Sequence, residues 1–290
     1  MKLPAFDYQR PASIEAVIRI LTDFPGDAKI IAGGQSLLPV MAFRFASPSV
    51  LVDLAGVPGL KDIVPDDEGV WIGAMVRWVD IERSACLRTA CPLVPAAVEH
   101  IAHYQVRNRG TIGGSLSHAD PAAEMPGIII TCDAELEVVG PAGARRIPAS
   151  EFIIGPLTTS MADDDVLTRI RFPAWPSARR WAFTEFSQRR GDYAYAGVAL
   201  YYDEDAEGKM ANAHIGVIAA ATLPCRLHEA EQALNGKRLD DALIEGVSQL
   251  AANGFPAQED PHASAAYRRS LVATLVEQTL RQASTRNDHP

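Results

Sequence analysis

The chain has 290 residues, of which 48% are hydrophobic and 22% are charged, so it can build a core in two or three domains. Its net charge of −9 argues against nucleic acid as the main partner. No apolar run approaches the roughly 18 residues that a membrane span requires. The opening Met1-Lys2-Leu3-Pro4-Ala5-Phe6 lacks the apolar segment of a signal peptide, so we expect a cytoplasmic protein.

Residues 1–57 predict a small β-α-β-α-β unit. Ser13 is a typical N-cap for a helix over residues 14–22, whose apolar residues recur at helical spacing. A short apolar strand at 29–32 leads into a glycine stretch, and a helix is expected over 36–45. The β-branched segment 49–54 predicts a buried strand that completes the unit.

Residues 58–175 predict a second unit of mixed helices and strands. We expect strands at 69–74, 126–131, 135–139 and 166–172, helices at 78–85 and 95–101, and a glycine loop at 108–115. The segment 126–131 is assigned to a strand because it contains three consecutive isoleucines.

Residues 176–290 predict a third unit. Two strands at 196–202 and 214–220 are joined by a polar connection, which is typical of an antiparallel hairpin. From Leu227 onward the apolar residues recur with a helical period, so the chain should end in helices.

Two glycine stretches carry most of the functional information. They are Ala32-Gly33-Gly34-Gln35-Ser36-Leu37-Leu38-Pro39 and Thr111-Ile112-Gly113-Gly114-Ser115-Leu116. Adjacent glycines allow positive φ and close approach of a ligand, and successive N–H groups can form a concave anion site. Neither stretch is a P-loop or a Rossmann fingerprint. Two tight turns are the alternative, whereas a pair of such loops fits a ligand with two linked phosphates.

Cysteine and histidine residues give no sign of a metal site. Cys86, Cys91, Cys132 and Cys225 form no C-x-x-C pair, so local spacing cannot build a zinc or iron–sulfur centre. His100 and His103 could share a helix face, but such a pair is more often part of a helix surface than of a metal site. We therefore expect no metal ligands in this chain.

These motifs resemble those of a known family. The two glycine stretches, the opening Pro4-Ala5-Phe6-Asp7-Tyr8, the segment Ser117-His118-Ala119-Asp120-Pro121-Ala122-Ala123-Glu124 and Arg189-Arg190-Gly191-Asp192-Tyr193-Ala194 resemble the FAD-binding medium subunit of molybdenum hydroxylases. This is the family of carbon monoxide dehydrogenase and xanthine dehydrogenase, and the resemblance covers nearly the whole chain.

The resemblance implies a role for each motif. The FAD pyrophosphate should be held by Ala32, Gly33, Gly34, Gln35, Ser36 and Leu37 together with Thr111, Gly113, Gly114 and Ser115. Asp120 and Glu124 match acidic residues of the family that accept hydrogen bonds from the ribityl or ribose hydroxyls of FAD. Tyr193 matches a side chain that lies against the isoalloxazine ring, and Leu157 matches an apolar contact in the flavin pocket. Gln35 stands where some relatives have His, so the FAD should be noncovalent.

The implied fold is α+β. Two N-terminal α/β subdomains, 1–57 and 58–175, should clasp FAD as in flavoproteins of the vanillyl-alcohol-oxidase type, and 176–290 should form a C-terminal antiparallel sheet with helices. Molybdopterin and [2Fe–2S] centres should belong only to partners, a large and a small subunit, in a dimer of heterotrimers. FAD would receive electrons from the [2Fe–2S] centres and pass them to an external acceptor.

Two other functions stay open at this point. A self-sufficient FAD oxidoreductase would need a base near the flavin, for which Tyr193 and His118 are the candidates. A nucleotide-binding module without redox chemistry could use the same glycine stretches. The substrate of a molybdenum partner could be carbon monoxide, an N-heterocycle or an aldehyde, and the final electron acceptor is equally open.

Overall fold

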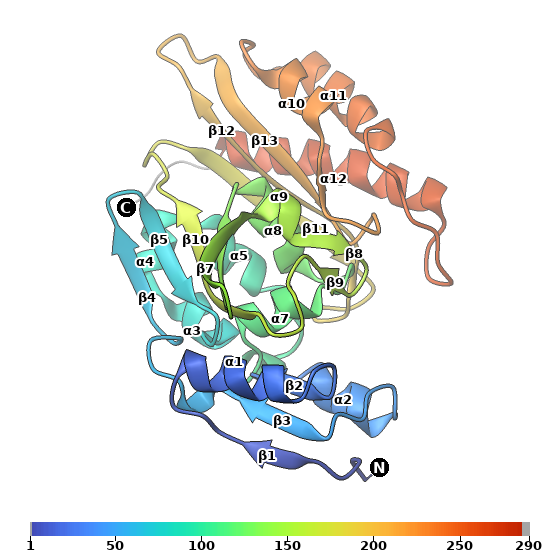
Figure 1. Ribbon diagram of the computed structural model, residues 1–290. Coiled ribbons are helices and arrows are strands. Elements are labelled where there is room, and N and C mark those ends of the chain that lie inside the picture. The colour runs from blue at the N-terminus through green and yellow to red at the C-terminus, as the bar shows by residue number, and fades with distance from the viewer. Residues whose placement is uncertain (1, 286–290) are drawn as a thin grey trace.

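The computed structural model describes residues 2–285 and has an α+β architecture of three units (Figure 1). In the first unit, three parallel strands form a sheet in the order β1-β3-β2. Ser13 caps the first helix, because its Oγ accepts a hydrogen bond from the Ala16 N–H at 3.2 Å, as the sequence predicts. The elements are β1 Asp7–Gln9, α1 Ile14–Asp23, β2 Ala28–Ile31, α2 Leu37–Ala42, β3 Val50–Asp53 and the 3-10 turn Leu54–Gly56.

The second unit contains a five-stranded antiparallel sheet in the order β4-β5-β10-β6-β7. Its strands are β4 Ile63–Asp66, β5 Gly69–Gly73, β6 Glu135–Gly140, β7 Gly143–Pro148 and β10 Val166–Pro173, with a separate small pair of β8 Ile153–Gly155 and β9 Thr158–Thr159. Its helices are α3 Trp78–Arg83, α4 Ala85–Ala90, α5 Leu93–Val98, α6 Tyr104–Arg107, α7 Ile112–His118, α8 Glu124–Thr131 and α9 Ala149–Phe152.

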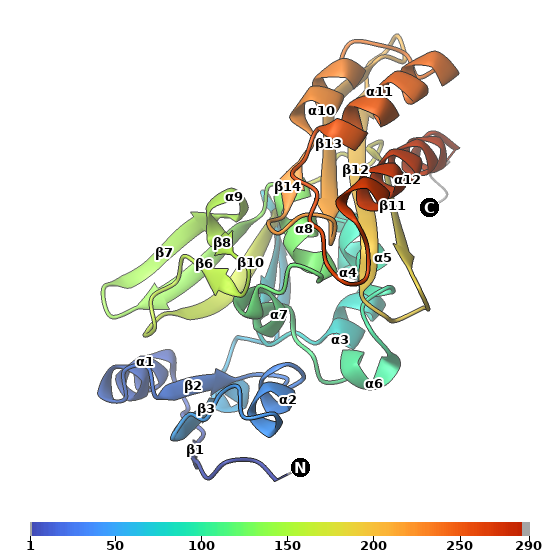
Figure 2. The same cartoon turned by 90° about the vertical axis from the view of Figure 1, so that its right-hand side faces the viewer.

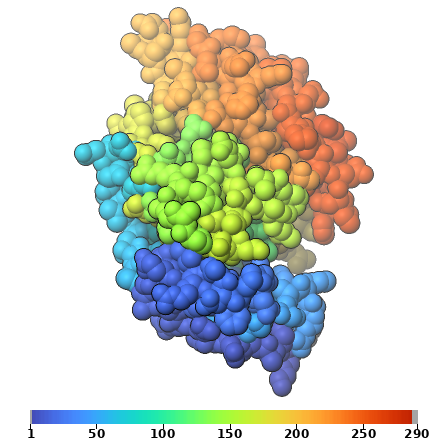
Figure 3. Space-filling model, in the orientation of Figure 1, coloured from blue at the N-terminus to red at the C-terminus, as the bar shows by residue number. Residues whose placement is uncertain are grey.

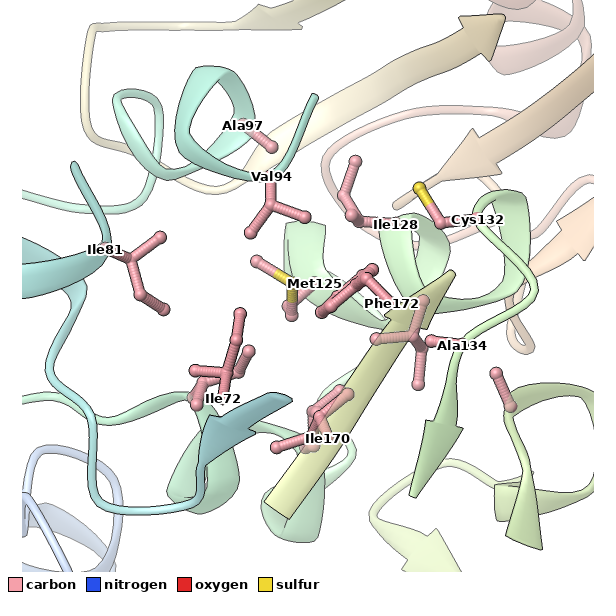
Figure 4. Packing of buried hydrophobic residues seen from close by; sticks show 14 of the residues in the cluster. Ile72, Ile81, Val94, Ala97, Met125, Ile128, Cys132, Ala134, Ile170 and Phe172 are labelled. Carbon is pink, nitrogen blue, oxygen red and sulfur yellow. The ribbon is translucent and has the colours of Figure 1, made fainter. Parts of the chain in front are cut away.

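The segment expected as a strand over 126–131 is instead part of helix α8, so that prediction was wrong. Its isoleucines suggested a strand, but a helix that is apolar on all sides is stable when every side is buried. Met125 and Ile128 of α8 face Val94 and Phe172 in the core of the second unit (Figure 4). A Cβ on Gly127 would lie only 2.3 Å from Ile218 Cγ1, so this glycine lets α8 lie directly against β13.

The third unit is a four-stranded antiparallel sheet, β11-β12-β13-β14, covered by three helices. Its elements are β11 Arg180–Ser187, β12 Ala194–Glu204, β13 Met210–Ile218, β14 Cys225–Arg226, α10 His228–Leu234, α11 Asp241–Asn253 and α12 Ala265–Thr285. The helices cover one face of the sheet (Figure 2), and α8 lies close to β13 on the second unit's side. The expected hairpin and C-terminal helices are confirmed.

The second and third units share a hydrophobic core, whereas the first has a small core of its own. Buried side chains of the second unit pack with Phe183, Ala199 and Ile218 of the third. The core of the first unit contains Val17 and Val52. A few residues of the second unit, among them Met75 and Val166, also pack in this core. In Figure 3 the first unit, in blue, covers one end of the second. The seam between these two units is where the candidate site lies.

Candidate functional site

A cleft of about 720 Å³ lies between the first and second units and reaches the loop before β12 of the third. Its volume is in the range of about 300–1,000 Å³ that is usual for small-molecule and cofactor sites. All fourteen residues that the sequence nominated line this cleft: Ala32, Gly33, Gly34, Gln35, Ser36, Leu37, Thr111, Gly113, Gly114, Ser115, Asp120, Glu124, Leu157 and Tyr193. The fold therefore brings together residues from five separate segments of the chain.

Residues 32–37, which we call the first wall, follow β2 and present backbone N–H groups. Among the described residues, the N–H groups of positions 33–37 have no hydrogen-bond acceptor. Gly34 has φ +72°, a left-handed conformation that glycine adopts without strain. The Gln35 Nε2 donates to the Gly33 carbonyl at 3.2 Å, which stabilises the turn. Such a run of free donors can bind an anionic oxygen-rich ligand without a basic side chain.

The second glycine stretch belongs to residues 111–124, which we call the second wall, and it is a helix rather than the expected loop. Thr111 is the N-cap of α7, and its Oγ1 accepts from the Gly114 N–H at 3.2 Å. The Ser115 N–H donates to the Thr111 carbonyl at 3.1 Å. These N–H groups are therefore not free for phosphate. The second wall can instead bind a phosphate through the hydroxyls of Thr111 and Ser115. A hydroxyl oxygen that accepts a hydrogen bond can still donate its own proton.

Two of the glycines are required by contacts within the protein itself. The Gly113 N–H donates to the Ala74 carbonyl at 2.9 Å, and a Cβ on Gly113 would lie 2.4 Å from the Ala74 Cβ. A Cβ on Gly33 would lie 2.2 Å from the Arg109 carbonyl oxygen. Gly113 thus lets α7 pack on the end of β5, and Gly33 lets the first wall approach the backbone at Arg109 and Gly110, just before the second wall.

The two acidic residues of the second wall differ in character. Asp120 accepts a hydrogen bond from the Ala122 N–H at 2.9 Å through Oδ1. Glu124 begins α8 and is only 5% exposed. Burial, and then the charges of Glu185 and Asp120, raise the pKa of Glu124 to about 8. Glu124 is therefore protonated at neutral pH, and it can donate a hydrogen bond, whereas an ionised carboxylate would only accept.

Tyr193 and Leu157 hold exposed apolar surface at one end of the cleft. Tyr193 is 64% exposed, but its hydroxyl is partly desolvated beside Asp120, and both effects raise the pKa of this phenol to about 12. Leu157 is 61% exposed with φ +54°, and its N–H donates to the Ala119 carbonyl at 2.9 Å. A leucine in the left-handed region costs about 1–2 kcal/mol, so the fold maintains this conformation against a local preference.

The described lining of the cleft has few basic side chains, so backbone N–H groups are its main donors for an anionic ligand. Within the described part of the chain, Lys29 is the one lysine or arginine among the lining residues. Sequence reasoning missed this residue, as well as Thr158, Thr159 and Asp163, because nothing in their local pattern distinguishes them from ordinary strand and loop positions. His118, the base considered for a self-sufficient enzyme, also lines the cleft.

A cleft between two N-terminal units, with free backbone donors on one wall and hydroxyls on the other, suits a cofactor that contains phosphate groups, and the chain has no Rossmann fingerprint. The sequence matches identify the class. Residues 4–175 match the FAD binding domain in molybdopterin dehydrogenase, and residues 181–283 match the CO dehydrogenase flavoprotein C-terminal domain. The chain belongs to the family of FAD-binding medium subunits of molybdenum hydroxylases, which confirms the resemblance and FAD as its cofactor.

Individual relatives extend this result to the full chain. The nicotine 6-hydroxylase medium subunit of Paenarthrobacter nicotinovorans is 41% identical over 99% of this chain and 100% of that protein. Quinoline 2-oxidoreductase from Pseudomonas putida 86 superposes with a TM-score of 0.93 and 38% identity, covering 98% of this chain and 99% of that one. Carbon monoxide dehydrogenase from Hydrogenophaga pseudoflava gives a TM-score of 0.95 with 33% identity, covering 99% and 100%. The expected fold class is confirmed.

The described part of the chain contains neither a metal-binding cluster nor a membrane-spanning helix. Among residues 2–285, no group of three or more His, Cys, Asp or Glu side chains is arranged to hold a metal ion. Within the same residues, no helix has the length and apolar character to cross a bilayer.

Proposed function

We propose that this chain carries noncovalent FAD and transfers electrons within a molybdenum hydroxylase complex. The proposal rests on one observation. This chain matches the FAD-binding family, and all fourteen residues nominated from its sequence line a single cleft. FAD supplies the chemistry, since it stores two electrons and exchanges them singly or in pairs. The chain's own residues bind the cofactor, orient it and set its surroundings.

We place the pyrophosphate at the free N–H groups of positions 33–37, opposite the hydroxyls of Thr111 and Ser115. Asp120 and Glu124 would then bind hydroxyls of the ribityl or ribose part, Asp120 as acceptor and Glu124 as donor. We place the isoalloxazine ring at the end of the cleft formed by Leu157 and Tyr193, because the ring would bury the exposed apolar surface of these two side chains. Gln35 has no nucleophilic nitrogen for a flavin bond, which supports noncovalent binding.

The same proposal assigns the organisation of the chain and its partners. Residues 1–57 and 58–175 are the two FAD-binding subdomains, and 176–290 is the C-terminal domain. A molybdopterin-binding large subunit and a small subunit with [2Fe–2S] centres would complete a heterotrimer, two of which form the complex. The electrons would leave for an external acceptor. Four free cysteines support a reducing compartment, the cytoplasm.

An N-heterocycle is the substrate class that we propose for the whole complex. The support is the higher identity to the medium subunit of nicotine 6-hydroxylase, 41%, and to quinoline 2-oxidoreductase, 38%, than to carbon monoxide dehydrogenase medium chains, 32–33%. Substrate selection would occur in the molybdenum subunit. Oxidation of a pyridine or quinoline, and not of carbon monoxide, by the reconstituted complex is the expected result.

The decisive experiment compares the isolated chain with the complex. The isolated chain should purify yellow with one FAD and should oxidise no heterocycle or aldehyde. In the complex, reduction of the partner's iron–sulfur centres should be followed by bleaching of the flavin absorbance. A colourless chain that binds other nucleotides would favour a module without redox chemistry. Turnover of substrate by the isolated chain would favour the self-sufficient enzyme.

A further inference from the structure

A second cavity lies directly beside the FAD cleft. It has a volume of about 280 Å³ and is lined by Glu99, His100, Glu185, Phe186, Ser187, Arg190 and Gly191. Gly191 also lines the cleft itself, at the end where Tyr193 lies. The backbone around position 191 therefore separates the proposed ring end of the FAD site from a cavity that contains two titratable, partly buried side chains.

Glu185 is the unusual group in this cavity. Its side chain lies on β11 and is only 3% exposed. Its Oε1 is 3.3 Å from His100 Nδ1, whereas its buried Oε2 has no hydrogen-bond partner among the described residues. A buried carboxylate oxygen without a partner costs free energy, so it needs a functional or structural explanation. The proposed roles in FAD binding and electron transfer make no use of Glu185.

Glu185 has a titratable neighbour in the lining of each cavity, His100 in its own and Glu124 in the FAD cleft. The His100 side chain is 40% exposed, and its ring packs edge-on against Phe183 with centroids 4.9 Å apart. Glu124 lines the FAD cleft and is coupled electrostatically to Glu185. The charge of Glu185 is the second cause, after burial, of the raised pKa of Glu124, so it favours a proton on Glu124.

Building on the proposed electron-transfer function, we propose that Glu124, Glu185 and His100 form a proton path between solvent and the ring end of the FAD cleft. Full reduction of FAD by the partner's one-electron iron–sulfur centres takes up two electrons and two protons, and reoxidation by the external acceptor releases both pairs. His100 would take each proton from solvent, Glu185 would pass it inward, and Glu124 would deliver it. The return path runs in reverse, and no residue changes its oxidation state.

The surrounding charges are consistent with a path that carries protons rather than a structural ion pair. Asp120 and the Tyr193 phenol face Glu124 from the cleft side, while Glu99 and Arg190 line the outer cavity beside His100. Burial and the neighbouring carboxylates raise the pKa of Glu124 to about 8, which is close to the pH at which the enzyme would work. A group that gains and loses a proton near the operating pH is the most effective relay.

The kinetic test uses the complex with its partners and three variants. In Glu185→Gln and His100→Ala, flavin reduction after rapid reduction of the iron–sulfur centres should slow by about tenfold or more and show a larger solvent deuterium isotope effect. Imidazole should restore part of the rate to His100→Ala alone. Glu99→Gln is the matched control, because it removes a carboxylate that lines the same cavity but is exposed. Its rate should stay within about twofold of the parent.

A spectroscopic test on the full chain requires no FAD. The infrared carbonyl stretch of a protonated carboxylic acid should be present at neutral pH and absent in Glu124→Gln. In Glu185→Gln this band should disappear at lower pH than in the parent, because the neighbouring negative charge has been removed. A band whose midpoint is unchanged in Glu185→Gln would overturn the coupling on which the path depends.

The outcomes separate this proposal from the proposed function. Parent and Glu185→Gln complexes that show the same rate and isotope effect would overturn the proton path, while the electron-transfer function would stand. Loss of FAD from Glu185→Gln would also overturn it, because Glu185 would then shape the pocket. If iron–sulfur electrons never reach the flavin in the parent, the electron-transfer function fails, whatever the infrared band shows.

Discussion

The two walls of the cleft contain the same Gly-Gly pair and use it for opposite purposes. In the first wall, the N–H groups of positions 33–37 have no acceptor among the described residues, and all five residues line the cleft. In the second wall, Gly113 and Gly114 lie in the first turn of α7, where their N–H groups are bonded to Ala74 and Thr111. Under the proposed function, one pair would bind the cofactor through its backbone, whereas the other serves the packing of a helix whose neighbouring side chains line the cleft.

The packing behind each wall matches this difference. The first wall belongs to a unit whose small core contains residues such as Val17 and Val52. The second wall rests on the core shared by the second and third units, in which Ile112 and Leu116 of α7 are fully buried. We therefore expect changes in the first wall to lower FAD affinity and changes in the second wall to lower the stability of the protein itself.

The largest effect should come from Gly113→Val in the second wall. Its Cβ would lie 2.4 Å from the Ala74 Cβ and 2.7 Å from the Ala74 carbonyl oxygen, and neither can retreat from the core. The free energy of unfolding of the FAD-free protein should fall by about 3 kcal/mol or more in a denaturant titration. Gly246→Val, in helix α11 with open space at the Cβ, is the control and should change stability by less than about 0.5 kcal/mol, because valine favours a helix slightly more than glycine does. Equal losses would contradict the packing role.

Glu124 should make the stability of the second wall depend on pH. Folded Glu124 keeps its proton up to about pH 8, while an unfolded glutamate loses it near 4.5, so the folded state binds more protons in between. This contribution to stability is therefore present at low pH and is lost as the pH rises through that window. Between pH 6 and 8 the loss should be about 2 kcal/mol, and Glu124→Gln should abolish it. The exposed Glu151→Gln should leave the parent's pH profile unchanged.

A smaller effect, on affinity rather than stability, is expected for Gly34→Val in the first wall. A β-branched residue at φ +72° is strained by about 1–2 kcal/mol, and the free loop can relieve this only by turning its N–H groups away. FAD affinity, measured by fluorescence titration, should fall about tenfold. Gly26→Val has nearly the same φ, +74°, in a turn outside the cleft, so it should carry similar strain without loss of affinity. A drop in affinity for both would point to general loosening of the first unit.

The signals by which the sequence nominates residues for the site are local. Adjacent glycines, a capping Ser13 and alternating apolar residues can each be recognised within a few positions, and all fourteen nominated residues do line one cleft. A local sequence pattern cannot show which N–H groups lack an acceptor. The carbonyls of Ala74 and Val76 accept hydrogen bonds from α7, and this contact exists only because β5 ends beside that helix in the folded protein.

Helix α8 and the protonation of Glu124 were missed for a related reason. Three consecutive isoleucines favour a strand when considered alone, and only the presence of core on both sides makes a helix stable there. The pKa of Glu124 depends on burial and on Glu185, which lies in another unit of the chain. Properties that arise from contacts between distant segments require the fold before they can be inferred.

The smallest expected effect concerns Thr111, whose hydroxyl could both cap a helix and bind the cofactor. The Thr111 hydroxyl accepts from the Gly114 N–H as the cap of α7 and can at the same time donate to a phosphate oxygen. Thr111→Ala should lower the free energy of unfolding by about 1 kcal/mol and also weaken FAD binding, whereas Thr111→Ser should preserve both. Ser84→Ala removes the corresponding cap of α4, whose Oγ accepts from the Leu87 N–H at 3.2 Å away from the cleft. It should cost similar stability with no change in FAD affinity. If Thr111→Ala behaves in the same way as Ser84→Ala, the hydroxyl only caps the helix, and the second wall must contact the pyrophosphate through Ser115.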